Sequence, residues 1–94
     1  ALVPALVAAR TGARAAELLA RLADHRRFGL QVVGVTTSED LDPGAPGAPW
    51  LGTLDGLPRH LASSGAREVL VADDLGRLEL LELLEACERA GVEA

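Results

Sequence analysis

The stretch LVAARTGARAAELLARL, residues 6–22, decides the fold of this 94-residue chain. It opens on a short, continuous apolar run, which is typical of a strand that is buried on both faces. From residue 13 onward the apolar residues recur at helical spacing, at Ala15, Leu18, Leu19 and Leu22. The stretch therefore predicts a strand, a tight turn and an amphipathic helix in direct succession.

The rest of the chain continues this alternation. Further strands are expected at residues 30–35, 50–52 and 67–73, and further helices at residues 56–64 and 75–91. A loop rich in Pro, Gly and Asp covers residues 36–49, and Val92 opens one more strand. The pattern predicts an α/β fold, a Rossmann-like three-layer sandwich with a mainly parallel sheet of about four to five strands.

Length and composition limit the classes of protein to which the chain can belong. Residues 1–94 have room for a single domain, and because the chain starts without Met we expect it to be a fragment of a longer one. Nine Arg, no Lys and fourteen acidic residues give a net charge of -5, which excludes a nucleic acid partner. No apolar run reaches the roughly 20 residues that span a bilayer, so we expect no membrane insertion.

The turn after residue 9 resembles a dinucleotide-binding fingerprint. A G-x-G-x-x-G motif would need glycine at positions 10, 12 and 15, where this chain has Arg10, Gly12 and Ala15. Alanine is accepted at the third position, and Gly12 is the residue that lets the backbone approach a pyrophosphate. Only Arg10 departs from the motif. The helix that follows would still attract an anion at its N-terminus, with Arg10 or Arg14 adding positive charge.

A nucleotide would lie in the crevice between the turns after Ala9 and Ala72, because ligands bind where the strand order of such a sheet reverses. The residues that would line this site are Arg10, Thr11, Gly12, Ala13, Arg14, Thr37 and Asp73. Thr37 stands where an acidic residue would bind the ribose of NAD. We favour a turn without a ligand over a working site, and no cofactor is assigned, although NAD(P) or CoA stays open.

The sequence carries no recognisable catalytic or metal-binding set. Asp73 and Asp74 stand at the carboxyl end of the strand at 67–73, where paired carboxylates can act as acid and base, but Asp74 is more simply an N-cap. His25 and His60 are expected at polar helix ends or faces, and Cys87 on an apolar stripe. A lone cysteine cannot form an internal disulfide and favours a reducing compartment. We therefore assign no catalytic residue and no metal ligand.

Three segments resemble a known family: FGLQVVGV at 28–35, APWLGTLDGLPRHLASSGAREVLVAD at 48–73 and LLELLEACERAGVE at 80–93. They look like the Rossmann-like cytoplasmic domain of bacterial polyprenyl glycosylphosphotransferases, which start exopolysaccharide synthesis. The most specific runs are LGTLDGLP at 51–58 and EACERAGV at 85–92. A related domain precedes the catalytic part of nucleotide-sugar dehydratases. The resemblance therefore fits a longer parent protein of either kind, a transferase or a dehydratase.

The resemblance implies a non-catalytic regulatory or scaffolding domain, similar to nucleotide-binding domains. In the family it lies between transmembrane helices and a catalytic domain that moves a sugar phosphate from a nucleotide sugar to undecaprenyl phosphate, on the cytoplasmic side of the bacterial inner membrane. One alternative is the NAD(P)- or CoA-binding domain of a nucleotide-sugar dehydratase or epimerase. Another is an interaction module that forms a homodimer through a sheet edge or the Leu-rich last helix. A nucleotide or nucleotide sugar is the expected small-molecule partner.

Overall fold

The computed structural model describes residues 2–22, 29–39 and 48–94. These residues confirm the predicted α/β fold with a parallel sheet. In chain order the elements are β1 (Val3–Ala9), α1 (Gly12–Leu22), β2 (Leu30–Thr37), β3 (Trp50–Thr53), the short 3₁₀ helix η2 (Leu54–Gly56), α2 (Leu57–Ser64), β4 (Glu68–Val71) and α3 (Arg77–Ala90). The predicted end of the first helix, His25 and most of the predicted loop at 36–49 lie outside the described residues.

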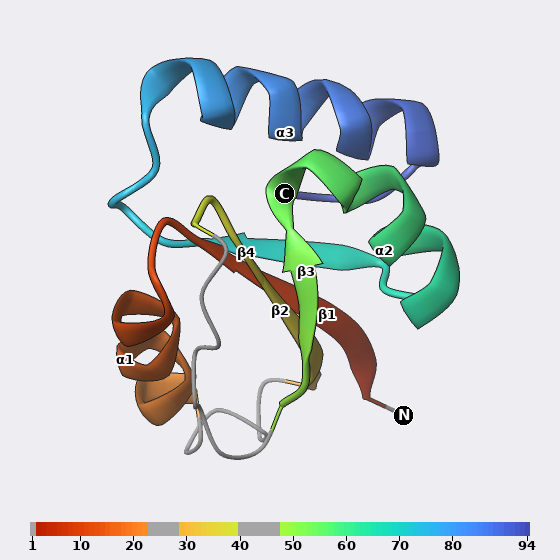
Figure 1. Ribbon diagram of the computed structural model, residues 1–94. Coiled ribbons are helices and arrows are strands. Elements are labelled where there is room, and N and C mark those ends of the chain that lie inside the picture. Colours follow the sequence, from red (N-terminus) through yellow and green to blue (C-terminus); the bar gives the residue numbers. More distant parts are fainter. Residues whose placement is uncertain (1, 23–28, 40–47) are drawn as a thin grey trace.

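The sheet has the strand order β3-β2-β1-β4, and every pairing is parallel. The chain moves outward from β1 to β3 on one side and then crosses to β4 on the other side, so the order reverses between β1 and β4 (Figure 1). Glu93 pairs in parallel with Glu68, and its carbonyl accepts the N–H of Val69 at 2.7 Å. The strand predicted to open near Val92 therefore begins beside β4.

Two apolar cores lie on opposite faces of the sheet, and β1 contributes to both. Leu6 and Ala8 belong to the core under α2 and α3, whereas Val7 and Ala9 belong to the core under α1. All four side chains are fully buried. This two-sided burial explains why the strand is a continuous apolar run rather than an alternating one. Figure 1 shows α1 on one side of the sheet and α3 on the other.

Gly34 makes room for a neighbouring side chain inside the sheet. Its close neighbour is the side chain of Leu51 in β3. A Cβ built at position 34 would lie 2.6 Å from Leu51 Cδ1 and 3.2 Å from Leu6 Cδ2. The pairing of β1 with β2 also shifts register between Ala5 and Leu6. Gly34 is thus a packing residue of the sheet.

The last helix begins later than the sequence pattern predicts. Gly76 is the N-cap of α3, and its N–H donates to Glu79 Oε1 at 3.3 Å. The carboxylate three positions into the helix therefore satisfies a donor that would otherwise be free. Asp74 is not the N-cap that the sequence suggested, because its side chain bonds elsewhere.

Candidate functional site

The turn between β1 and α1 is held by hydrogen bonds at the start of the helix. Thr11 caps the helix: its Oγ1 accepts the N–H of Arg14 at 3.2 Å and its carbonyl accepts the N–H of Ala15 at 3.1 Å. Gly12 is buried at the first helical position, and Ala15 is fully buried in the core against β1. Gly12 and Ala15 thus have the small size and the burial that the fingerprint requires for close packing of the helix on the strand.

Arg10 occupies the position of the first fingerprint glycine without backbone strain. No non-glycine residue in the described ranges has a positive φ, so Arg10 has an ordinary conformation. Its backbone is tied on both sides. The N–H donates to Asp74 Oδ1 at 3.1 Å, and the carbonyl accepts the N–H of Glu39 at 3.2 Å. The turn is thereby linked to the end of β2 and to the segment after β4.

These bonds place a carboxylate of the protein at the point where the strand order reverses. In a functional dinucleotide-binding site this crevice holds the pyrophosphate of the ligand, near the positive end of the helix dipole. Here the carboxylate of Asp74 accepts a backbone N–H of the turn. An incoming phosphate would have to displace that bond and lie beside a like charge, which is unfavourable.

Arg14, one of the two cations expected at the crevice, is already paired. Arg14 Nη1 lies 3.0 Å from Glu17 Oε2, and Arg14 Nη2 lies 3.7 Å from Asp73 Oδ1. The pKa of Arg14 is raised, first by the hydrogen bond to Glu17 and then by the charge of Asp73. These side chains are exposed, so the pairs are weak. They nevertheless compete with an anionic ligand for the same guanidinium group.

Thr37 lies at the end of β2, and its side chain forms hydrogen bonds within the protein. Its side chain is fully buried. The hydroxyl donates to the carbonyl of Glu39 at 2.5 Å and accepts the indole N–H of Trp50 at 3.1 Å. The structure thus brings the segment 10–14 together with Asp73 at the crevice, whereas the Thr37 side chain bonds toward β3. A neutral, buried hydroxyl of this kind does not replace a carboxylate that binds a ribose.

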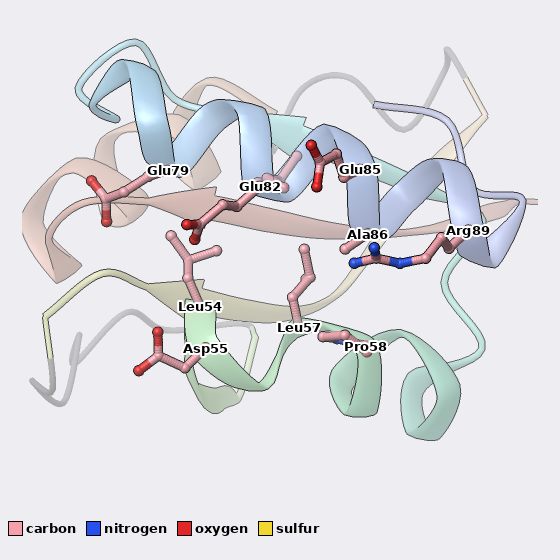
Figure 2. Close-up of a pocket in the computed structure, with 10 residues that line it drawn as sticks. Leu54, Asp55, Leu57, Pro58, Glu79, Glu82, Glu85, Ala86 and Arg89 are labelled. Carbon is pink, nitrogen blue, oxygen red and sulfur yellow. The ribbon is translucent and has the colours of Figure 1, made fainter.

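Among the surface hollows, one lies near the candidate residues and one beside the last helix. One of about 270 Å³ runs along α1 and β4, with Arg14, Arg21, Glu17 and Asp73 at its rim. The other, of about 310 Å³, lies between the η2–α2 segment and α3. Figure 2 shows its residues: Leu57 and Ala86 on the apolar side, and Asp55, Glu79, Glu82, Glu85 and Arg89 around them. The lining residues of this second hollow include no histidine, serine, threonine or cysteine.

His60 is buried, in contrast to the polar helix face that the sequence suggests. It is 8% exposed, and its Nε2 lies 2.9 Å from the carbonyl of Thr53. A carbonyl only accepts, so the hydrogen of this bond is on Nε2. A Cβ at Gly52 or Gly56 would come within 3.0 Å of His60 Cε1. The two glycines thus make room for the ring. This packing gives a structural reason for the run LGTLDGLP, and the glycine pair was the signal in the sequence.

The remaining chemistry-bearing groups do not form a site. Cys87 is buried, and burial raises the pKa of its thiol, which keeps it neutral and unreactive at neutral pH. Within residues 2–22, 29–39 and 48–94, no group of three or more His, Cys, Asp and Glu side chains is arranged to hold a metal ion. Nor does this part of the chain contain a helix that is long and apolar enough to cross a membrane.

Comparison with known proteins found no match: no protein family, no curated protein and no solved structure matches the chain.

Proposed function

We propose that this chain is a non-catalytic scaffolding or regulatory domain whose nucleotide crevice is closed by the protein's own carboxylates. The observation that carries the proposal is the bond from the Arg10 N–H to Asp74 Oδ1, at the place where a ligand phosphate would bind. The pairing of Arg14 with Glu17 and Asp73 supports it, because one of the two cations expected at the crevice is engaged. Such a domain contributes its fold and surface rather than a cofactor.

The parent protein in this proposal is a membrane-bound sugar-phosphate transferase of polysaccharide synthesis. The support is the resemblance of residues 28–35, 48–73 and 80–93 to the cytoplasmic domain of polyprenyl glycosylphosphotransferases. The parent would transfer a sugar phosphate to undecaprenyl phosphate on the cytoplasmic side of the bacterial inner membrane. The alternative parent, an NAD-dependent nucleotide-sugar dehydratase, requires an acidic residue at the position of Thr37, where its carboxylate would bind a ribose. The buried and bonded Thr37 disfavours that alternative.

Thermal unfolding with a panel of NAD, NADP, CoA and UDP-glucose tests whether the crevice binds a nucleotide. A ligand present at 100 times its Kd stabilises a fold by about 2.7 kcal/mol. That gain raises the Tm of a domain of this size by roughly 10 °C or more. With each ligand at about 1 mM, we expect the Tm to change by no more than about 1 °C. A change that small corresponds to a Kd weaker than millimolar. A rise of several degrees with any dinucleotide would overturn the proposal.

The role within the parent is tested with membranes that contain the full-length protein. The assay measures transfer of sugar phosphate from UDP-sugars to undecaprenyl phosphate. Asp73→Asn keeps the size of an exposed side chain in the crevice, and Leu6→Asp puts a charge into the core. We expect the rate to stay within about twofold for Asp73→Asn and to be lost with Leu6→Asp, which unfolds the domain. Loss of transfer in a folded Asp73→Asn protein would instead assign the crevice to catalysis, and absence of transfer in the unaltered protein would reject this parent.

A further inference from the structure

The helix α3 is apolar on two opposite faces, and only one of them meets the core. Leu83, Ala86 and Cys87 are buried against the rest of the domain. On the other side Leu78, Leu81 and Leu84 follow one another at a spacing of three residues, which places them on one surface of the helix. They are 69%, 52% and 42% exposed. A cluster of exposed leucines on a folded domain indicates an interaction surface.

Opposite charges stand at the two ends of this leucine row. Arg77 precedes it and Glu88 follows it, and both side chains are exposed. Eleven positions separate the two residues, which is about three helical turns, so they lie on the same side as the leucines. In the part of the chain that the structure describes, neither residue takes part in an ion pair. We call the surface made by Arg77, Leu78, Leu81, Leu84 and Glu88 the outer α3 face, and the exposed Glu85, one turn after Leu81, lies at its edge beside the hollow between α2 and α3.

The face runs from the positive Arg77 through the leucines to the negative Glu88. It is therefore complementary to a second copy of the same face that runs in the opposite direction. In an antiparallel pair centred between positions 82 and 83, Arg77 of one copy lies opposite Glu88 of the other. The same two-fold axis places Leu81 opposite Leu84, and each contact occurs twice because the interface is isologous. A parallel pair would instead place Arg77 against Arg77 and Glu88 against Glu88. Charge complementarity therefore favours the antiparallel arrangement.

We propose that the outer α3 face binds the same face of a second copy of this chain, with the two helices antiparallel. Figure 1 shows α3 at the top of the view with the sheet below it. Because the three leucines of the face are exposed, a second copy can reach them without rearrangement of the fold. The proposal does not rest on the proposed function, since neither the crevice nor the parent enzyme enters it.

The size of the face sets the expected affinity. The helix has 14 residues, which is about 21 Å of length at 1.5 Å per residue. A single helix face of that length falls short of the roughly 800 Å² per partner that a standard stable interface buries. We therefore expect a Kd on the order of 10–100 µM rather than nanomolar. The measurement must accordingly reach high protein concentration.

Sedimentation equilibrium between about 10 µM and 1 mM brackets that Kd and tests the association. The weight-average mass of the unaltered chain should rise from the 9.7 kDa of the monomer toward twice that value. Leu81→Lys should abolish the rise, because it places two charges at the centre of the pair. Leu2→Lys is the matched control: Leu2 is also an exposed leucine, at 41%, but it precedes β1. The control should associate like the unaltered chain.

Charge reversal tests the antiparallel order specifically. Arg77→Glu and Glu88→Arg each place like charges opposite one another twice, and each should weaken association at least about tenfold. The double variant restores opposite charges and should return to within about threefold of the original Kd. Each substitution suits the helix dipole, with acid at the N-terminus and base at the C-terminus, so folding is not endangered. Circular dichroism of each variant checks the fold.

Three results would overturn the proposal. The first is a mass that stays monomeric up to 1 mM. The second is association that Leu81→Lys leaves unchanged, which would assign the contact to another surface, such as the edge of the sheet. The third is a double charge variant that associates no better than the two single variants, which would exclude the antiparallel contact between residues 77 and 88.

Discussion

Arg10 illustrates, at the scale of single residues, how a dinucleotide-type turn can persist without its first glycine. Its φ is negative and its backbone N–H and carbonyl both have partners within the protein. The turn therefore needs no glycine for its backbone conformation, and the N–H and carbonyl of Arg10 need no ligand for their hydrogen bonds. Asp74 supplies the negative charge that a phosphate would bring, so the polar groups of the turn and the dipole of α1 remain balanced in the absence of a nucleotide.

Thr37 should stabilise the sheet edge through its hydroxyl. Thr37→Val keeps the shape of the side chain but leaves the indole N–H of Trp50 and the carbonyl of Glu39 without their partner. We expect a loss of about 1–3 kcal/mol in the free energy of unfolding, the usual cost of leaving a buried polar group unpaired. Urea denaturation followed by fluorescence of the single Trp measures it.

The matched control for this substitution is Thr53→Val. Thr53 is a half-buried residue of β3, and its side chain makes no capping hydrogen bond. Its replacement should change the free energy of unfolding by no more than about 0.5 kcal/mol. Equal losses in the two variants would contradict the assigned role of the Thr37 hydroxyl.

Single residues differ in how far the sequence alone can assign them. The roles of Gly12 and Ala15 are predictable, because a strand, a turn and a helix in succession fix what can fit there. The role of Asp74 is not, because its partner Arg10 is 64 residues away and meets it only through the sheet order. His60 was misread for a related reason. Its helix position looks polar, and its burial depends on two glycines in the preceding segment.

At the scale of elements, α3 carries two apolar faces with different roles. Leu83→Ala removes a side chain that is 2% exposed in the core and should cost about 2–5 kcal/mol. Leu84→Ala removes the same atoms from a side chain that is 42% exposed and should cost less than about 1 kcal/mol. Urea denaturation at a few micromolar, where pairing of copies is negligible, compares the two free energies of unfolding. Similar losses would contradict the assignment of the faces.

Periodicity predicts the existence and the type of the elements better than their first residues. The 3.6-residue and continuous apolar patterns locate the described helices and strands, because burial imposes those patterns. The starts of α2 and α3 were misplaced because local capping decides them. The N-cap of α2 is Gly56, the last residue of η2. The side chain of Glu79, and not Asp74, satisfies the N–H at the start of α3.

At the scale of the whole molecule, the parallel sheet brings the ends of β1 and β4 together and thereby defines the crevice. Strand and helix alternation predicts that arrangement, because crossovers in such sheets are right-handed and ligands bind where the order reverses. What it cannot predict is which side chains fill the crevice. The bond from Arg10 to Asp74 and the contact of Arg14 with Asp73 depend on the relative placement of two distant turns.

The central claim is that these carboxylates occupy the place of a bound phosphate. Its most direct test is an NMR titration of the backbone amides of residues 11–14 with inorganic pyrophosphate. The unaltered chain is compared with Asp73→Asn/Asp74→Asn and with the control Asp55→Asn, at constant ionic strength because salt screens exposed charges.

The unaltered chain and the control should show no saturable shift of these amides up to about 10 mM pyrophosphate, because carboxylates repel the anion. The double variant should show saturable shifts confined to the turn. Saturable binding by the unaltered chain with the same Kd as the double variant would contradict the account.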